Sequence, residues 1–285
     1  MITSDPVREC RFRDRARPGS REGDKVKEEG TYGLPSAQVL AAEAARLERQ
    51  GALLWLRESQ LLSQAGVLAD SRALDVGCGP GRILMRFREF KPALTVGLDL
   101  NQGFLRSALT ISPVTRGTAT WLPFASDSFD VVYARFILRH IQEPDRVLEE
   151  VHRVLRTGGI FASLEPDESA LELDPQPDGW PLLRAALNDT ARRRSADPFV
   201  GRRVRRLCLQ TGLRNARSQV VVWTTEDLGP EPFVEVLLAP SARPIDADLL
   251  DSSRAKAIWN SVTAWSKRDD AFGYGITVFT SAVKG

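Results

Sequence analysis

Cysteine and histidine are scarce in this sequence, and their scarcity excludes two kinds of structure. The three cysteines, Cys10, Cys78 and Cys208, lie far apart among 285 residues and form no Cys-x-x-Cys pair. The two histidines, His140 and His152, have no neighbouring ligands at a spacing that is familiar from zinc sites. We therefore expect a reducing compartment, no disulfide framework and no metal centre.

Long apolar runs and an excess of charge of one sign are also missing. No stretch approaches the length of a membrane span, and the N-terminus has no apolar signal region. The net charge is only +2, and the basic residues are spread through the chain and matched by acids. These features predict a soluble, cytoplasmic protein that has no membrane span and no nucleic-acid partner.

The N-terminal quarter of the chain divides into two parts of different composition. Residues 1–30 are dense in charge of both signs and contain almost no large apolar side chain, which predicts a mobile tail. Residues 31–69 predict two helices, one that begins at Pro35 and one over 53–65. Such helices could pack on a sheet, close over a site as a lid, or form the contact of a homo-oligomer.

Residues 70–285 predict one large domain that begins with alternating β-like runs and helical patterns. The five β-like runs of this alternation are 73–76, 94–99, 114–116, 129–133 and 160–164. They predict a doubly wound α/β fold, in which a mostly parallel sheet is covered on both faces. Two later runs, at 219–225 and 276–283, lack a clear crossover helix and predict an antiparallel edge.

Two segments of this domain are typical of insertions. Residues 168–197 are rich in Pro and Asp, and residues 230–270 are mostly helical, so we expect a helical cap. The aromatic side chains in and beside these segments are Trp180, Phe199, Phe233, Trp259 and Trp265. They suit the binding of an apolar or aromatic ligand, and they suit a helical core equally well.

A cluster of glycines follows the first β-like run and predicts a nucleotide-binding turn. The cluster reads Gly77-x-Gly79-x-Gly81, and Asp99 ends the next β-like run, where it can accept hydrogen bonds from two ribose hydroxyls. The spacing differs from the G-x-G-x-x-G of dinucleotide sites, and no Lys-Ser/Thr follows as in a P-loop. Asp75, just before the turn, would repel a pyrophosphate but suits an ammonium or a sulfonium.

Several motifs occur in a fixed order along residues 70–165. They are LDVGCGPG (74–81), VGLDL (96–100), LPFASDSFDVVY (122–133), L-x-H (138–140) and EEVHRVLRTGG (149–159). Together they resemble the class I S-adenosylmethionine-dependent methyltransferases, and most closely the branch of ubiquinone/menaquinone-biosynthesis and natural-product enzymes. The resemblance implies a Rossmann-like sheet of seven strands with an antiparallel last strand, and S-adenosyl-L-methionine as the cofactor.

The resemblance also implies roles for residues of the glycine turn and the next strand. The turn Gly77, Gly79 and Gly81 would bring the backbone close to the methionyl part of the cofactor. Asp75 would support the turn or bind the ammonium group, and Asp99 would bind the ribose hydroxyls.

Residues further along the chain would contact the adenine ring. Leu100 and Leu122 would sandwich it. Where the family has Gly-Asp-Ala before its LPF motif, this chain has Gly-Thr118-Ala119. Thr118 can still accept a hydrogen bond, although without charge, and Ala119 can contribute its backbone.

Residues at the N-terminus and after the fourth strand complete the expected cofactor site. Related enzymes close a Tyr and an E-x-x-R-L-x-x-Q helix over the cofactor, which here implies Tyr32, Arg46 and Gln50. Arg46 or Gln50 could hold the cofactor carboxylate. The alternative is a solvated helix face with a Glu43–Arg46 pair. Arg135, directly after the fourth strand, is expected to line the cofactor pocket.

Candidates for a catalytic base lie where open α/β sheets bind ligands, beyond the carboxyl ends of their strands. His140 follows strand 4, and Glu165 and Asp167 follow strand 5. A base is needed only if the acceptor loses a proton, because alignment carries much of the catalysis of methyl transfer. A helix-cap or core role for His140 stays open.

The predicted function is methyl transfer to a small, apolar or aromatic metabolite, such as a specialised metabolite or a quinone precursor. The residues leave open whether carbon, oxygen or nitrogen is methylated. Two alternatives stay open: methylation of RNA or protein, and a non-catalytic protein that binds S-adenosylmethionine as a partner subunit.

Overall fold

A computed structural model describes residues 37–238 and 245–285. The predicted tail over residues 1–30 and the candidate Tyr32 lie outside these ranges. Among the described residues, no helix is long and apolar enough to cross a membrane.

The described chain is built on one sheet of seven strands in the order β3-β2-β1-β4-β5-β7-β6. In chain order the strands are β1 (Arg72–Val76), β2 (Leu94–Asp99), β3 (Val114–Arg116), β4 (Phe129–Arg135), β5 (Leu155–Asp174), β6 (Leu213–Thr224) and β7 (Phe272–Lys284). The first five strands pair in parallel, while β7 runs antiparallel to both β5 and β6. The predicted fold class and its antiparallel last strand are therefore confirmed.

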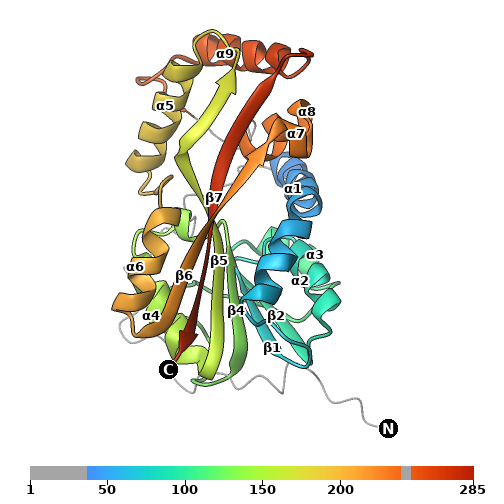
Figure 1. Cartoon of the computed structure of the whole chain (residues 1–285), viewed down its shortest axis with the longest axis vertical. Coiled ribbons are helices and arrows are strands. Elements are labelled where there is room, and N and C mark those ends of the chain that lie inside the picture. The colour runs from blue at the N-terminus through green and yellow to red at the C-terminus, as the bar shows by residue number, and fades with distance from the viewer. Residues whose placement is uncertain (1–36, 239–244) are drawn as a thin grey trace.

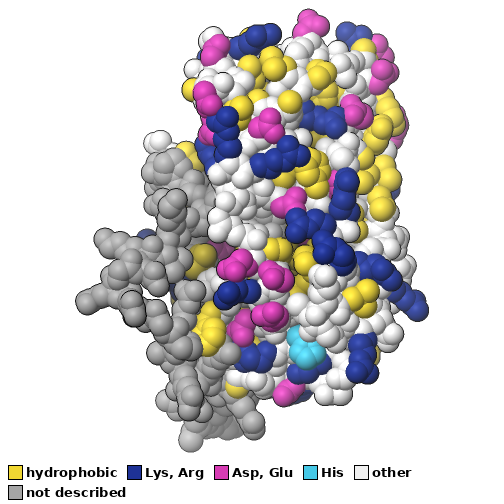
Figure 2. Space-filling view, turned by 90° about the vertical axis from the view of Figure 1, so that its left-hand side faces the viewer, with side chains coloured by type: hydrophobic (Ala, Val, Ile, Leu, Met, Phe, Trp, Pro, Cys, Tyr) yellow, Lys and Arg dark blue, Asp and Glu magenta, His cyan; other side chains and the backbone are white. Residues whose placement is uncertain are grey.

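Helices cover both faces of the lower part of the sheet (Figure 1). On one side lie α1 (Ala37–Gln64), α2 (Arg82–Phe87) and α3 (Gln102–Ala108), and on the other lie α4 (Pro144–Val154) and α6 (Gly201–Gln210). The apolar stripe of α4 is fully buried against the strands, as the spacing of Val147, Val151 and Val154 requires. Figure 2 shows the α4–α6 side, where basic and acidic side chains are interleaved.

Helix α1 corrects the prediction of two N-terminal helices. It is one helix of 28 residues that continues through Gly51. A glycine inside a helix costs about 1 kcal/mol, but here the packing of buried Leu54, Trp55 and Leu62 outweighs this cost. Gly51 itself is buried, and a Cβ there would lie 3.8 Å from the Cβ of Arg82. A homo-oligomer through this helix stays a prediction.

Strand β5 is much longer than the predicted 160–164, because its second half pairs with the start of β7. Glu172 to Asp174 lie opposite Tyr274 to Phe272, after an irregular stretch between Asp167 and Glu172. Such a bulge re-aims side chains and often occurs beside a functional site. The strand continues because Leu171 and Leu173 are buried in the core.

The upper ends of β5, β6 and β7 form a second lobe together with four helices (Figure 1). We use "second lobe" for these strand ends with α5 (Trp180–Arg193), α7 (Thr225–Leu228), α8 (Pro230–Phe233) and α9 (Ser252–Trp265). The two predicted insertions thus pack together on an extension of the sheet. Trp180, Phe233 and Trp265 are at most 3% exposed in its core, so their role is packing.

Candidate active site

A cavity of about 1040 Å³ opens at the carboxyl ends of β1, β2 and β4 and extends beneath the second lobe. We call its lower part, around the glycine turn, the cofactor end, and its upper part, beneath the second lobe, the chamber. Of the predicted site residues, those that line the cavity are Arg46, Gln50, Asp75, Gly77, Gly79, Asp99, Leu100, Thr118, Ala119, Arg135, His140 and Asp167. Gly81, Glu165 and Leu122 do not line it.

The glycine turn adopts a backbone conformation that side chains would strain. Gly77, Gly79 and Gly81 have φ angles of +75°, +51° and +88°. A Cβ on Gly77 would lie 2.8 Å from Cγ1 of Ile137, whereas one on Gly79 would meet only Leu47, at 3.8 Å. The backbone at Gly79 is therefore open to a ligand.

Gly81 corrects the sequence interpretation, because it faces a helix and not the cavity. A Cβ there would lie 2.9 Å from the Cα of Ala108 in α3. The glycine is needed for close packing of the turn on that helix.

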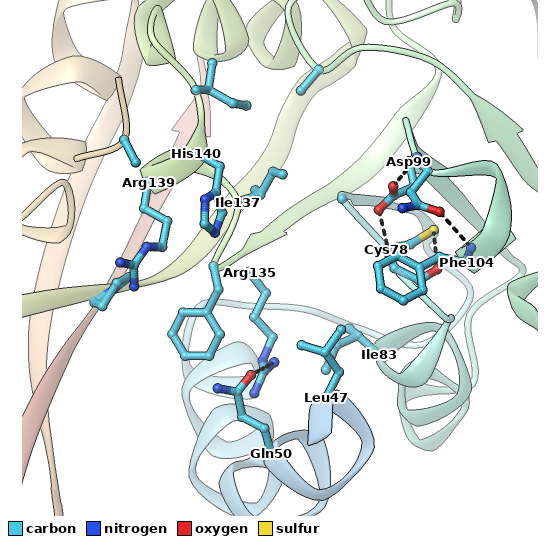
Figure 3. A pocket seen from close by; sticks show the side chains of 18 of the residues that line it. Leu47, Gln50, Cys78, Ile83, Asp99, Phe104, Arg135, Ile137, Arg139 and His140 are labelled. Carbon is cyan, nitrogen blue, oxygen red and sulfur yellow. Dashed lines mark hydrogen bonds between the residues drawn. The ribbon is translucent and has the colours of Figure 1, made fainter. Parts of the chain in front are cut away.

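Asp99 is oriented by two backbone amides at the end of β2 (Figure 3). Its Oδ2 accepts a hydrogen bond from Gly79 N at 2.9 Å, and its Oδ1 accepts one from Asn101 N at 2.7 Å. Burial raises its pKa, and these backbone hydrogen bonds oppose the rise. Each oxygen keeps a lone pair, so the carboxylate can still accept two ligand hydroxyls.

Asp75 is a buried carboxylate whose hydrogen bonding is incomplete. It is 2% exposed, and its Oδ2 has no hydrogen-bond partner in residues 37–238 and 245–285. Burial raises the pKa of Asp75 to about 7; Arg135 opposes this rise, while Asp99 and Glu58 add to it. A positively charged ligand group beside it would favour the ionised form.

Three polar residues of α1, Glu43, Arg46 and Gln50, are buried at the wall of the cavity instead of facing solvent. Arg46 donates through Nε and Nη2 to Glu43, at 2.8 and 2.5 Å, and both residues are at most 8% exposed. Gln50 Nε2 donates to the carbonyl oxygen of Val236 at 2.8 Å, and Arg46 Nη1 donates to the same oxygen at 3.3 Å. The Glu43–Arg46 pair therefore exists, but the face that carries it is not solvated. Through their hydrogen bonds to Val236, Arg46 and Gln50 connect α1 to η3 (Val234–Leu238).

A second group of buried polar contacts joins α1 to the end of β4, and it involves a residue that the sequence analysis missed. Glu58 accepts hydrogen bonds from Arg135 Nε at 2.9 Å and from the Tyr133 hydroxyl at 3.1 Å. Glu58 lies on the buried face of α1, between Leu54 and Leu62. An acid inside an apolar helical stripe was the signal that could have identified it.

Comparison with known proteins finds a methyltransferase domain within this chain. Residues 74–163 match the model of a family described as a methyltransferase domain. An uncharacterized methyltransferase of Schizosaccharomyces pombe is 26% identical over 220 residues, which cover 69% of this chain and 78% of that protein. The demethylmenaquinone methyltransferase of Roseiflexus castenholzii is 36% identical over 100 residues, which cover 33% of this chain and 42% of that protein. The matches thus span most of the first relative but less than half of the second.

A solved structure of a methyltransferase has a similar fold. The phosphoethanolamine N-methyltransferase 2 of Haemonchus contortus, solved in complex with S-adenosyl-L-methionine, superposes with a TM-score of 0.55 at 17% identity. The match covers 87% of this chain and 57% of that one. This chain carries a class I S-adenosylmethionine-dependent methyltransferase domain. That relative holds S-adenosyl-L-methionine, which is therefore the molecule to compare with this site.

The cofactor end of this methyltransferase fits that molecule. The incompletely bonded carboxylate of Asp75 suits the positive charge of the methionyl end. The backbone at Gly79 leaves space for close approach, and the oriented carboxylate of Asp99 suits a ribose.

The prediction of the residues that contact the adenine ring needs one correction. Leu122 is fully buried outside the cavity, where its backbone N donates to Glu150 at 2.7 Å, so it cannot sandwich a ligand ring. Leu100 lines the cavity and is 38% exposed. Thr118 also lines it, and its hydroxyl lies 2.9 Å from that of Thr120.

The three candidate bases of the methyltransferase lie in different surroundings. His140 lines the cavity (Figure 3). Asp167 also lines it, but Arg202 contacts both of its oxygens at 2.5 and 2.6 Å. Burial would raise the pKa of Asp167, yet the hydrogen bonds from Arg202 and Ser169 outweigh it and lower the pKa, which makes this carboxylate a poor base.

Glu165 lies behind the cavity wall. It is fully buried, and its Oε1 accepts hydrogen bonds from the backbone N of Ile137 at 3.0 Å and of Leu138 at 2.9 Å. Burial raises its pKa to about 7, although these backbone hydrogen bonds oppose the rise. Glu165 does not reach the cavity. Its hydrogen bonds instead stabilise the turn that carries His140.

Proposed function

We propose that this methyltransferase transfers the methyl group of S-adenosylmethionine to a small, apolar or aromatic metabolite. The observation that carries the proposal is the chamber beyond the cofactor end, whose apolar lining includes Leu171, Leu187, Ala191, Leu237 and Ile276. The whole cavity, at about 1040 Å³, lies at the upper limit of single small-molecule sites, which span about 300–1,000 Å³. It therefore has room for an acceptor beside the cofactor.

The relatives support an acceptor of this kind. A protein named for demethylmenaquinone is 36% identical over the shared 100 residues. That name belongs to that protein, and the chain shares less than half of its length. It supports the same class of acceptor here without specifying one.

We assign the cofactor-binding residues by their positions around the cofactor end. Asp99 would bind the ribose hydroxyls, and Leu100, Thr118 and Ala119 would border the adenine. The backbone of the glycine turn would lie along the methionyl part, with the carboxylate of Asp75 near its positive charge.

Catalysis by the protein would consist mainly of alignment, with His140 as the base where one is needed. The bound cofactor supplies a methyl group that is already activated on a sulfonium. An acceptor hydroxyl or amine would lie in the chamber, with its nucleophilic atom facing the cofactor end. His140 would take the proton that such an acceptor loses.

The role of His140 has a matched control in the other histidine. With an acceptor that loses a proton, His140→Ala should lower kcat and remove the acidic limb of the pH–rate profile. His152→Ala, on α4 and away from the cavity, should change neither. An unchanged rate and profile for His140→Ala would remove it as the base.

The function itself is tested with methyl-labelled S-adenosylmethionine and a metabolite extract. We expect the label in a low-mass product that can be extracted with organic solvent and identified by mass spectrometry. Unlabelled S-adenosylhomocysteine should form as the second product. Label in RNA or protein would favour the macromolecular alternative, and bound but unreacted cofactor would favour a non-catalytic partner protein.

Ion pairs on the face shown in Figure 2 weigh against a nucleic-acid acceptor at that face. On the α5–α6 face the arginines are interleaved with acids (Figure 2). Arg193 pairs with Asp248 at 2.7 Å, and Arg194 pairs with Asp246 at 2.8 Å. These two paired arginines do not contribute to a basic stripe of the kind that phosphate binding requires.

A further inference from the structure

Glu58 is a fully buried carboxylate that the methyl-transfer chemistry does not use. Its oxygens accept hydrogen bonds from Arg135 Nε, at 2.9 Å each, and Arg135 Nη2 lies 2.8 Å from Oε1. The Tyr133 hydroxyl donates to Oε2 at 3.1 Å. A buried carboxylate is costly unless it is paired and hydrogen-bonded, and Glu58 meets both conditions through residues of β4.

Arg135 is held from three sides but still has donors for a ligand. Besides its contacts to Glu58, its Nη1 donates to Gln50 Oε1 at 3.2 Å, and its guanidinium lies 4.6 Å from the ring centroid of Phe136. A guanidinium has five N–H groups, so both terminal nitrogens keep an N–H beyond these contacts. Arg135 lines the cavity, on the side of Gln50 (Figure 3).

The Arg135 guanidinium and the Asp75 carboxylate both line the cofactor end and carry opposite charges. Arg135 is the group that most strongly opposes the rise in the pKa of Asp75, and Asp75 lies opposite Tyr133 in the β1–β4 pairing. The cofactor carries an ammonium and a carboxylate at its amino-acid end. An anionic and a cationic side chain at the same end of the cavity match these two groups, and the planar fork of an arginine suits a carboxylate.

We propose that Glu58 is a positioning residue, which holds Arg135 in place to bind the carboxylate of the cofactor's amino-acid end. The proposal rests on S-adenosylmethionine as the cofactor. It makes the affinity for the amino-acid end depend on a residue of α1 that does not itself touch the ligand. Gln50, which contacts both Arg135 and the carbonyl of Val236, links the same guanidinium to the cavity wall formed by η3.

The test compares two ligands that differ in the amino-acid end. Calorimetry measures the affinity of wild type and Glu58→Gln for S-adenosylmethionine and for 5′-methylthioadenosine, which lacks that end. Charge-assisted hydrogen bonds contribute about 1.5–3 kcal/mol, so Glu58→Gln should lose about tenfold or more in affinity for S-adenosylmethionine. Its affinity for 5′-methylthioadenosine should change less than about twofold.

Two further variants make the result specific. Arg57→Gln removes the neighbouring ion pair of α1 with Asp227, which lies outside the cavity, and should change neither affinity. Glu58→Asp keeps the charge but shortens the reach, so it should show a smaller loss that is again confined to S-adenosylmethionine. This variant keeps the test open if Glu58→Gln fails to fold.

Three outcomes would overturn the proposal. The first is an equal loss of affinity for both ligands in Glu58→Gln, because that marks a merely structural role. The second is an unchanged affinity of Glu58→Gln for S-adenosylmethionine. The third is a wild type that binds both ligands equally. A wild type that binds neither ligand would instead refute the cofactor assignment, so the two failures are distinguishable.

Discussion

The cofactor end and the chamber are two parts of one cavity that the sequence builds in different ways. The cofactor end comes from residues that lie at the ends of neighbouring strands, such as the turn 77–81 and Asp99. The chamber comes from four separate segments, which contribute Leu171, Leu187 and Ile276 among others. Local motifs therefore specify the cofactor, whereas the acceptor site depends on how distant segments pack.

The largest effect of a single substitution at constant pH should come from crowding the glycine turn. Gly77→Ala adds strain at a φ of +75° and a contact of 2.8 Å with Ile137. Strain and overpacking each cost about 1–3 kcal/mol, so we expect a loss of about 3 kcal/mol in the free energy of unfolding, measured with urea. Gly158→Ala is the matched control, because its φ is +78° but nothing lies within 4 Å. Equal losses would show that strain alone, and not the turn's packing, sets the cost.

The pH dependence of stability should separate the two buried carboxylates. The pKa values of Asp75 and Glu165 are each raised to about 7 in the folded protein, from 3.8 and 4.5. The folded state then binds more protons than the unfolded state, so stability falls as pH rises from about 4 to 7, by at most about 1.4 kcal/mol per pH unit for each group.

The two carboxylates should respond differently to the cofactor. Urea unfolding between pH 5 and 8 should show a flatter slope for Asp75→Asn and for Glu165→Gln than for wild type. Saturating S-adenosylmethionine should flatten the contribution of Asp75 alone, because only that carboxylate lies at the cofactor end. A slope that neither substitution changes would contradict the raised pKa values of Asp75 and Glu165.

Loss of the carboxylate of Asp99, which is assigned to bind the ribose, should weaken cofactor binding without closing the chamber. Asp99→Ala removes two charge-assisted hydrogen bonds, and calorimetry should show at least about a tenfold loss in affinity for S-adenosylmethionine. Asp130→Ala, at a carboxylate that pairs with Arg156 away from the cavity, should leave the affinity unchanged. Unchanged affinity in Asp99→Ala would remove the ribose assignment.

The smallest effect should come from filling the chamber. Ala191→Leu adds volume to the lining from α5, so KM for the acceptor should rise about tenfold, as pocket changes of this size produce, while the affinity for S-adenosylmethionine stays constant. Arg192→Leu, the next residue on the exposed side of α5, is the control and should change neither value. Equal effects on cofactor and acceptor would mean that the two ends are not separate.

The sequence alone predicted the sheet and most of the cofactor end, because each signal there is short. A turn of three glycines, an acid at a strand end and a helical stripe can each be recognised within a few residues. The class of fold and the cavity positions of Asp75, Gly77, Gly79 and Asp99 follow from such signals.

Long-range packing explains what the sequence did not predict. Glu58 and Arg135 are separated by 77 positions, so neither residue's neighbours indicate the pair. The helix α1 continues through Gly51 because this glycine is buried against Arg82. Strand β5 continues past a bulge whose sequence resembles a loop. Glu165 follows the predicted strand 160–164 as a base would, but in the structure it lies within β5 and the turn at Ile137 covers it.

A crystal structure with bound S-adenosylhomocysteine tests the division of the cavity most directly. We predict the ribose hydroxyls on Asp99, the amino-acid carboxylate within hydrogen-bond distance of Arg135, and a chamber beside Leu187 and Ile276 that the product leaves free. An adenosyl group that occupies the chamber beneath the second lobe would contradict this division.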